Sequence, residues 1–301
     1  MNIKMFRNLL SVIVIPGMAI ALQSCSQKFE SGQQGFTLTT ITALSESDKS
    51  ETKTAIDKDL KTLWLTGDAI NVFFGNSLSS KFVCQEAGYT AQFKGSIDVV
   101  TGGGEGLDDN TYLCGVYPYR ADTCCDGSVI TLTLPSQQEA KADTGADDLF
   151  PVVARSSNFY MSFYHICGCF RFTVSNPDIV KVTLSGNNDE DIAGRAVVSM
   201  ENKTPKVESV IAGSKELTMN APEGECFEVG KDYYFALFPN NFEKGVTLTY
   251  YKQGQKATYV HGSINLPRKA FIRFRDKDAG LTFENIPLNG WGEGENIGGE
   301  I

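Results

Sequence analysis

Short segments in which hydrophobic and polar residues alternate recur along most of the chain. In one of them, Ile130, Leu132 and Leu134 share one side and threonines separate them. The same alternation appears in residues 180–184 and 246–250. Because successive side chains of a strand point to opposite faces, this period of two predicts strands with one buried face.

Turn-forming residues separate these segments, and helical periodicity is nearly absent. Gly, Asn, Asp and Pro divide about fourteen such segments, roughly seven on each side of residue 165. The polar stretch 252–256 predicts a hairpin turn into the segment 257–261. Regularly spaced strands with turn signals indicate sandwiches or barrels and exclude a parallel βαβ sheet. We therefore predict an all-β chain.

The first residues carry the parts of a secretory signal. Lys4 and Arg7 provide a basic start without any acid, and an almost wholly apolar run covers residues 9–22. This run of about 14 residues is too short for a transmembrane helix, which needs about 20. Residues 1–24 are therefore predicted to be a signal peptide.

A cysteine follows this signal directly. The sequence Leu-Gln-Ser-Cys at 22–25 resembles the lipobox of bacterial lipoproteins, in which the chain is cut before the cysteine and the sulfur is acylated. We expect cleavage between Ser24 and Cys25, and a lipid anchor such as palmitate on Cys25 that holds the protein at the outer membrane. Gln23 is less usual in this motif, and an ordinary signal peptide with an incidental cysteine is the alternative. Residues 25–35, rich in Gly, Ser and Gln, predict a flexible tether.

Length and charge narrow the function classes. Removing 24 of the 301 residues leaves 277 and shifts the net charge from −9 to −11, because Lys4 and Arg7 are lost. That length predicts two domains, which we assign to residues 36–160 and 161–301. The acidic balance argues against nucleic acid as a partner, since nucleic-acid binding needs clustered Lys and Arg.

The cysteines and histidines do not form a metal-binding pattern. Seven cysteines remain beyond Cys25, without any Cys-x-x-Cys pair, and the two histidines, His165 and His261, are far apart. We expect the thiols to be small buried hydrophobic groups, with one or two disulfides whose pairing stays open. The seven cysteines are Cys84, Cys114, Cys124, Cys125, Cys167, Cys169 and Cys226.

Motifs for catalysis are missing from the sequence. It has neither a Gly-x-Ser-x-Gly elbow nor a His-Glu-x-x-His helix. The Gly-containing stretch 224–232 has the wrong spacing for a phosphate loop, and the acidic stretch 187–191 lacks the spacing of an EF-hand, so a solvated loop is the simpler interpretation there. We predict a non-enzymatic protein without catalytic residues, metal or cofactor.

A series of short motifs occurs in an order that goes beyond generic β-structure. The order resembles that of the fimbrillin-like family, the type V pilins and their relatives. The C-terminal half is similar too, with a buried strand expected in 232–239 and a Trp- and Gly-rich tail at 290–301. The motifs are Thr52-Lys-Thr54, Trp64, Gly67-Asp68, Ile70-Asn-Val72-Phe73, Tyr117-Pro-Tyr119, Leu134-Pro-Ser-Gln-Gln138 and Phe163-Tyr-His165.

The resemblance implies a fold and a function. It implies two Greek-key, transthyretin-like β-sandwiches in tandem and a cell-surface subunit of a fimbria, as stalk, anchor or tip, that supports adhesion. The implied partners are other fimbrial subunits, in a homo- or hetero-polymer, together with a host or bacterial surface ligand. Such subunits assemble by β-strand exchange after an Arg-specific protease removes their first strand.

The sequence departs from this pattern at the expected cleavage site. No arginine occurs between Cys25 and Arg120, and Lys53 occupies the position of the family's arginine. Either another protease cuts at a lysine such as Lys49 or Lys53, or the first strand stays in place. A retained strand favours an anchor or a non-polymerising surface protein.

Two alternatives remain open at this stage. Trp291, Ile297 and Ile301 would share one face of an extended tail, which is either a donor strand for a neighbour or a disordered end. The alternative function is a non-polymerising surface lipoprotein that binds glycan or another ligand. That function needs exposed aromatic rings, and the tyrosine pairs Tyr117/Tyr119 and Tyr250/Tyr251 are the candidates.

Overall fold

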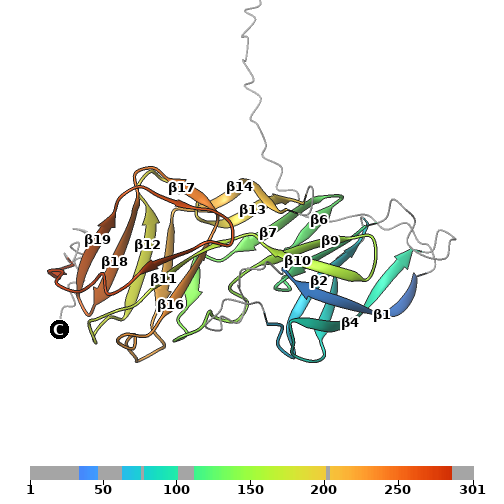
Figure 1. Ribbon diagram of the computed structural model, residues 1–301, viewed down its shortest axis with the longest axis horizontal. Helices are drawn as coiled ribbons and strands as arrows, with labels where there is room; N and C mark the ends of the chain where they lie inside the picture. The colour runs from blue at the N-terminus through green and yellow to red at the C-terminus, as the bar shows by residue number, and fades with distance from the viewer. Residues whose placement is uncertain (1–33, 47–62, 76–77, 101–111, 201–203, 287–301) are drawn as a thin grey trace, which may run out of the picture. The chain divides into compact units, whose positions relative to one another are not determined.

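The computed structural model describes residues 34–46, 63–75, 78–100, 112–200 and 204–286 of the chain (Figure 1). These residues all belong to one compact unit, Gly32–Ile301. They form strands, turns and loops and no helix, which confirms the all-β prediction. In these ranges no helix is long and apolar enough to span a membrane.

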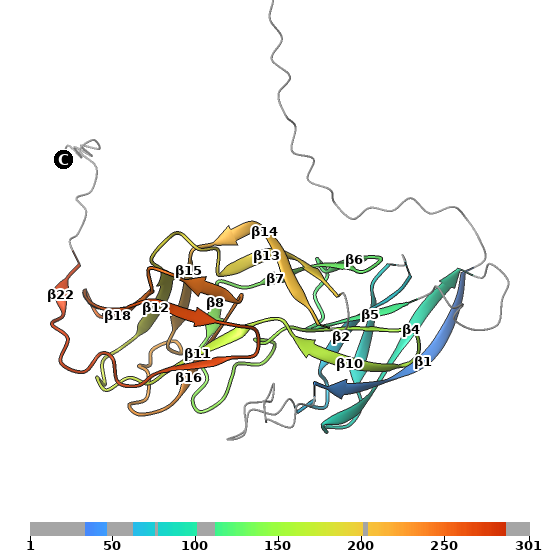
Figure 2. The same ribbon diagram turned by 45° about the horizontal axis from the view of Figure 1, so that its top comes forward.

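Seven strands of the N-terminal part form one closed sheet, in the order β1-β10-β9-β5-β2-β3-β4. The first strand closes this barrel, because it pairs with β4 on one side and β10 on the other. Figure 2 shows β1 beside both of them. The bounds are β1 (Gln34–Ser45), β2 (Ala69–Phe74), β3 (Ser80–Cys84), β4 (Thr90–Val100), β5 (Leu113–Tyr117), β9 (Val152–Ser156) and β10 (Tyr160–His165).

Trp64 organises the core inside the barrel. Its side chain is fully buried, and its ring meets Phe93, Tyr117 and Phe163 edge-on at centroid distances of 5.1–5.4 Å. Edge-to-face packing of aromatic rings stabilises a core beyond the area that it buries.

The remaining strands form four further sheets. Their orders are β16-β11-β21, β22-β19-β18-β12-β15-β8, β14-β13-β7-β6 and β17-β20. The bounds are β6 (Cys124–Asp126), β7 (Val129–Leu134), β8 (Gln137–Glu139), β11 (Gly168–Phe172), β12 (Lys181–Gly186), β13 (Ala193–Ser199), β14 (Lys206–Ser214), β15 (Glu216–Asn220), β16 (Tyr233–Leu237), β17 (Asn240–Phe242), β18 (Val246–Lys252), β19 (Gln255–His261), β20 (Ile264–Leu266), β21 (Phe271–Phe274) and β22 (Glu284–Asn285).

The strands predicted from alternation are present. β7 buries Ile130, Leu132 and Leu134, and β18 buries every second residue over most of its length. The hairpin turn predicted at 252–256 joins β18 to β19, with Gly254 at a positive φ of 71°. The described residues form twenty-two strands, whereas about fourteen were expected from the sequence.

The closed seven-stranded sheet differs from the expected N-terminal sandwich. A tandem of Greek-key sandwiches is not confirmed. Closure into a barrel satisfies both edges of β1, whereas an open sheet would leave edge strands exposed. Alternating residues occur in barrels and sandwiches alike, so the sequence pattern did not distinguish them.

Two strand pairings cross the boundary expected near residue 160. β7 and β8 precede that residue but pair with β13 and β15 of the C-terminal part. The division into domains at 36–160 and 161–301 stays a prediction, as does the assignment of residues 1–24 and 25–35.

Candidate functional site

The site residues expected from the sequence lie outside the described residues. This holds for the predicted signal cleavage and lipid attachment, for the lysines at which maturation was expected, and for the proposed donor tail. All of these assignments stay predictions. The residues are Ser24, Cys25, Lys49, Lys53, Trp291, Ile297 and Ile301.

Among the described elements, β1, the first strand of the barrel, lies in the sequence between the predicted lipid attachment site and the lysines at which maturation was expected. β1 runs antiparallel to β4 from Gln34↔Val100 to Leu44↔Thr90, and parallel to β10 from Thr42↔Tyr160 to Ser45↔Phe163. The Thr42 N–H donates to the carbonyl of Phe159 at 2.8 Å. Backbone hydrogen bonds thus hold the second half of β1 from both sides.

Side chains of β1 complete the barrel core. Ile41 and Ala43 are fully buried. Thr40, which precedes Ile41, is exposed. Full burial of an isoleucine side chain contributes about 1.5–3 kcal/mol. A chain that lost β1 would therefore expose two strand edges and an apolar slot.

The end of β1 is fixed by an ion pair with a distant residue. Glu46 accepts hydrogen bonds from Arg268 Nη1 at 2.7 Å and Nη2 at 2.9 Å, and from the backbone N–H of His165 at 3.1 Å. Lys269 Nζ lies 3.9 Å from Glu46 Oε1, and the glutamate side chain is only 8% exposed. A bidentate Arg–carboxylate pair of this kind is strong and directional.

Charges and burial shift the pKa values of this cluster. Burial by itself raises the pKa of Glu46, but the hydrogen bonds and charge of Arg268, with Lys269 and the His165 N–H, outweigh it and lower the pKa. Desolvation lowers the pKa of the buried His165 to about 4, against the opposing effect of Glu46. At neutral pH the cluster therefore holds an ionised Glu46 and a neutral His165.

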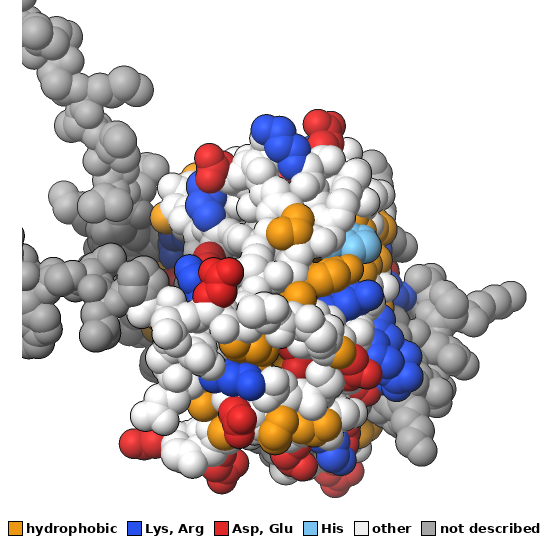
Figure 3. Space-filling model, turned by 90° about the vertical axis from the view of Figure 1, so that its left-hand side faces the viewer, with side chains coloured by type: hydrophobic (Ala, Val, Ile, Leu, Met, Phe, Trp, Pro, Cys, Tyr) orange, Lys and Arg blue, Asp and Glu red, His pale blue; other side chains and the backbone are white. Residues whose placement is uncertain are grey.

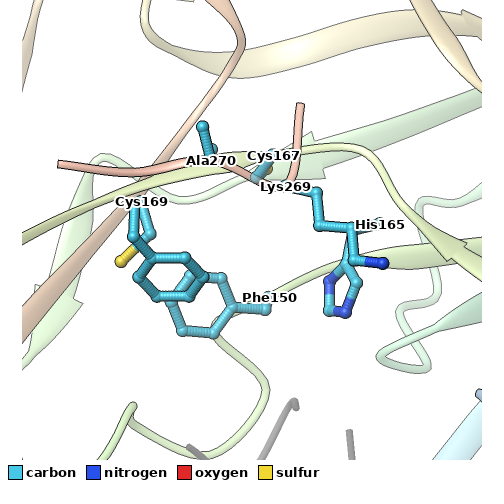
Figure 4. A pocket seen from close by; sticks show the side chains of 8 residues that line it. Phe150, His165, Cys167, Cys169, Lys269 and Ala270 are labelled. Carbon is cyan, nitrogen blue, oxygen red and sulfur yellow. The ribbon is translucent and has the colours of Figure 1, made fainter. Parts of the chain in front are cut away.

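The small cavity beside this cluster is not a ligand site. Its lining includes Phe150, His165, Cys167, Cys169 and Lys269, as Figure 4 shows. The cavity volume is about 10 Å³, which is at most the space of one water molecule. Burial raises the pKa of both thiols, so they are inert packing groups, as the sequence predicted.

Of the tyrosines expected as a ligand platform, two are buried and two are half-buried with a lysine over the ring. Tyr117 and Tyr250 are buried in the cores. Tyr119 lies under Lys81, and Tyr251 lies 3.8 Å under the ammonium of Lys181. These residues maintain the fold and do not form an exposed aromatic face.

The surface chemistry of the described residues gives no sign of a metal or nucleic-acid site. No group of three or more His, Cys, Asp or Glu side chains gathers among the described residues. On the face that carries β18 and β19, acidic and basic side chains alternate without a field of one sign (Figure 3). The cluster around Glu46 is the feature that sequence reasoning missed, because 222 residues separate Glu46 from Arg268.

Comparison with known proteins gives matches at the level of structure. No protein-family model matches this sequence, and no curated protein matches it either. A proposed cell adhesion protein from Bacteroides ovatus matches with a TM-score of 0.50 and 14% identity, over 83% of this chain and 96% of the other. This likeness shows a shared fold.

Two further solved structures match with TM-scores that are too low to carry an argument. A proposed cell adhesion protein from Bacteroides uniformis matches with a TM-score of 0.45 and 15% identity, over 82% of this chain and 96% of that one. The tip fimbrial protein Mfa3 from Porphyromonas gingivalis, with a C-terminal truncation, matches with a TM-score of 0.35 and 8% identity, over 83% and 98%. The structure neighbours of this chain are proposed cell adhesion proteins and fimbrial proteins from Bacteroidales. The fold that the chain shares with the Bacteroides ovatus protein is consistent with the fimbrillin-like family that the order of its sequence motifs resembles.

Proposed function

We propose that this chain is a non-enzymatic, fimbrillin-like subunit of a fimbria, exposed at the cell surface and carried to the outer membrane as a lipoprotein through Cys25. It assembles with other fimbrial subunits by exchange of β1 and supports adhesion as a stalk, anchor or tip subunit. Its two halves derive from transthyretin-like, Greek-key sandwiches, the first of which has closed into a barrel. The observation that carries the proposal is the position of β1 between β4 and β10.

Loss of β1 would prepare the barrel for a replacement strand. The edges of β4 and β10 would then offer unpaired backbone groups, and the places of Ile41 and Ala43 would be empty apolar slots. An extended segment whose apolar residues share one face fits such a groove, because alternate side chains of a strand point to one face. The tail of a neighbouring copy is the candidate donor, because even spacings place its Trp291, Ile297 and Ile301 on one face of an extended strand.

The ion pair at the end of β1 adds a requirement for the donor. Cleavage at Lys49 or Lys53 would remove Glu46 together with β1 and leave Arg268 partly buried without its carboxylate. Breaking a buried pair in this way costs about 3–5 kcal/mol. A donor strand that brings an acid to this position would recover the interaction.

The non-polymerising alternative keeps β1 in place. The absence of an arginine between Cys25 and Arg120 favours this alternative, because the family's protease has no site there. Such a chain would be a fimbrial anchor, or a surface lipoprotein that binds glycan or another ligand.

The state of the chain in sheared fimbriae tests the proposal. Mass spectrometry should find a mature N-terminus after Lys49 or Lys53 and no acyl chain. The matched control is a Lys49→Gln/Lys53→Gln variant, which should keep an acylated Cys25 and stay out of the shaft.

Other results would contradict specific parts of the proposal. A full-length, acylated chain inside fimbriae would reject exchange of β1 and identify an anchor. Absence of the chain from fimbriae, with an acylated full-length form on the cell surface, would reject the fimbrial function in favour of the ligand-binding alternative. A chain cut before Cys25 without acylation would reject the lipoprotein assignment.

A further inference from the structure

An open groove lies on the outer face of the barrel, where β9 and β10 meet the end of β13. Its volume is about 430 Å³, within the range of about 300–1,000 Å³ that small-molecule sites occupy. Most of the side chains that line it carry a hydroxyl or an amide group, and three of them are tyrosines. They are Tyr112, Arg155, Ser156, Ser157, Asn158, Tyr160, Ser162, Tyr164 and Met200.

Exposed tyrosine rings form the apolar part of this groove. Tyr160 is 67% exposed and Tyr112 is 39% exposed. A tyrosine face packs against an apolar ring surface while its hydroxyl bonds to polar groups. Tyr117 and Tyr250, by contrast, are buried in the cores and offer no exposed ring.

The turn between β9 and β10 is held rigidly beside these rings. Ser156 Oγ donates to the Tyr160 carbonyl at 2.8 Å, and Asn158 Oδ1 accepts from the Tyr160 N–H at 2.9 Å. Because the oxygen of Asn158 is engaged inward, its amide nitrogen remains a donor without a partner among the described residues. A fixed turn lowers the entropic cost of ordering a binding site.

Arg155 supplies a positive charge that the described residues leave uncompensated. Its guanidinium carbon lies 3.9 Å from the centroid of the Tyr112 ring, and its Nε is buried without a hydrogen-bond acceptor. Among the described residues, none forms an ion pair with Arg155 and no Asp or Glu lines the groove. A guanidinium has five N–H donors in a fork that matches a carboxylate.

We propose that this groove binds a saccharide that carries a carboxylate, such as a sialic or uronic acid. The carboxylate pairs with Arg155, the sugar ring packs on Tyr160, and the hydroxyls of the sugar bond to Ser156, Asn158 and Ser162. A phosphate-rich ligand such as nucleic acid does not fit, since the described residues of the lining offer a single cation and the chain carries a net charge of −9.

This site lies on a different face of the sheet from the one that β1 fills, although β1 pairs with the segment of β10 that carries Tyr160 and Ser162. The side chains of the groove stand on the outer face of β9 and β10, whereas β1 pairs with the edge of β10 and fills the inside of the barrel. The inference deepens the ligand-binding alternative and is compatible with a fimbrial subunit. Its failure would leave the fate of β1 untouched.

Binding by the purified full chain tests the inference. Isothermal titration with 3′-sialyllactose and with a glucuronate-containing tetrasaccharide should show saturable binding for at least one of them, and lactose should bind at least tenfold more weakly. The two acidic sugars distinguish a sialic acid from a uronic acid as the natural ligand.

Substitutions assign the binding to the groove. Tyr160→Ala should weaken binding about tenfold, since stacking on one aromatic ring contributes about that much to the affinity. Arg155→Gln should weaken it by about 10- to 100-fold and remove the preference for an acidic sugar. Tyr89→Ala, which removes a 48% exposed tyrosine elsewhere on the barrel, is the matched control and should bind as the unchanged chain does.

Two results would overturn the inference. One is no saturable binding of either acidic sugar by a chain whose circular dichroism is that of a folded β protein. The other is binding that Tyr160→Ala and Arg155→Gln leave unchanged, because the ligand would then occupy another site.

Discussion

Glu46 and Arg268 connect the end of the first strand to a residue 222 positions later. The pair is nearly buried on the glutamate side, which is 8% exposed, and the arginine side chain is 24% exposed. At such a site the loss of one partner is costly, because the other charge stays largely shielded from water. This residue pair is therefore more sensitive to substitution than the exposed pairs of the surface.

Glu46→Gln should destabilise the chain by about 3–5 kcal/mol, because Arg268 then lacks its carboxylate. Urea unfolding at pH 7 measures the change. The matched control is Glu208→Gln, which removes the acid of the exposed Lys206–Glu208 pair and should cost no more than about 1 kcal/mol.

The double variant Glu46→Gln/Arg268→Gln separates the charge effect from the loss of packing. It should be more stable than Glu46→Gln alone, since the uncompensated charge is gone. Equal costs for Glu46→Gln and Glu208→Gln would contradict the buried character of the pair.

His165 makes the stability of the chain depend on pH. Its pKa is lowered to about 4 by burial, from 6.5 in the unfolded chain. The unfolded state therefore binds more protons between these values, and the free energy of unfolding falls as the pH drops from about 6.5 to 4. The lowered pKa of Glu46 acts further down, with stability lost as the pH falls below the usual value of 4.5.

His165→Gln should flatten the stability profile between pH 6.5 and 4, where the unchanged chain loses about 3 kcal/mol from this group. The slope below pH 4.5 should persist in this variant, because Glu46 still titrates. Urea unfolding at pH 7, 5.5, 4.5 and 3.5 measures both slopes. A profile that His165→Gln leaves unchanged above pH 4.5 would contradict the assignment.

At the scale of elements, alternation in the sequence predicts those strands that have one buried face. β7 and β18 follow this pattern and were found at the expected residues. β5 is buried along its whole length and lacks alternation, because its residues face two cores. Strands of this kind cannot be distinguished by period.

The closure of the barrel could not be predicted from local pattern either. Closure depends on the pairing of β1 with β4 and with β10, which joins residue 42 to residue 160. The same limit applies to the site, since the sequence identified the first strand as a candidate but not Arg268 as its partner. Pairing between distant residues is set by the packing of the whole chain.

Gly95 lets β3 and β4 come together at the barrel wall. A Cβ at this position would lie 2.5 Å from Cδ2 of Phe82 and 2.6 Å from the carbonyl oxygen of Lys81. Phe82 is fully buried in the barrel core, so its ring has little room to move. Glycine in a strand often marks such a close approach.

Gly95→Ala should destabilise the chain by about 1–3 kcal/mol through overpacking. Thermal or urea unfolding measures this change. Gly262→Ala is the matched control, because nothing lies within 4 Å of a Cβ there and its φ is not positive. The control should change stability by less than about 0.5 kcal/mol, and a Gly95→Ala cost as small as this would contradict the tight approach.

At the scale of the whole molecule, two hydrophobic cores share strands. Val152 and Ala154 of β9 face the barrel core, and Val153 between them faces the core of the C-terminal part. β5 is divided in the same way, with Leu113 on one side and Cys114 on the other. A shared strand cannot lose its packing on one face and keep its position for the other, so the two cores should depend on each other.

This dependence predicts one cooperative unfolding transition. Trp64 reports on the barrel core, and a Trp291→Phe background makes it the only tryptophan of the chain. In this background, urea unfolding followed by fluorescence should coincide with unfolding followed by circular dichroism, which senses all strands. Phe172→Leu, in the other core, should lower stability by about 1–2 kcal/mol and shift the Trp64 transition equally.

Phe163→Leu, beside Trp64, provides the reciprocal test and should shift both signals by the same amount, because β9 and β5 transmit the loss to the C-terminal core. The ion pair between Glu46 and Arg268 adds to this coupling, since it ties the end of β1 to the segment before β21. A Trp64 transition that ignores Phe172→Leu would mean that the barrel unfolds by itself. In that case the shared strands would not couple the cores, and removal of β1 would loosen the barrel without affecting the rest of the subunit.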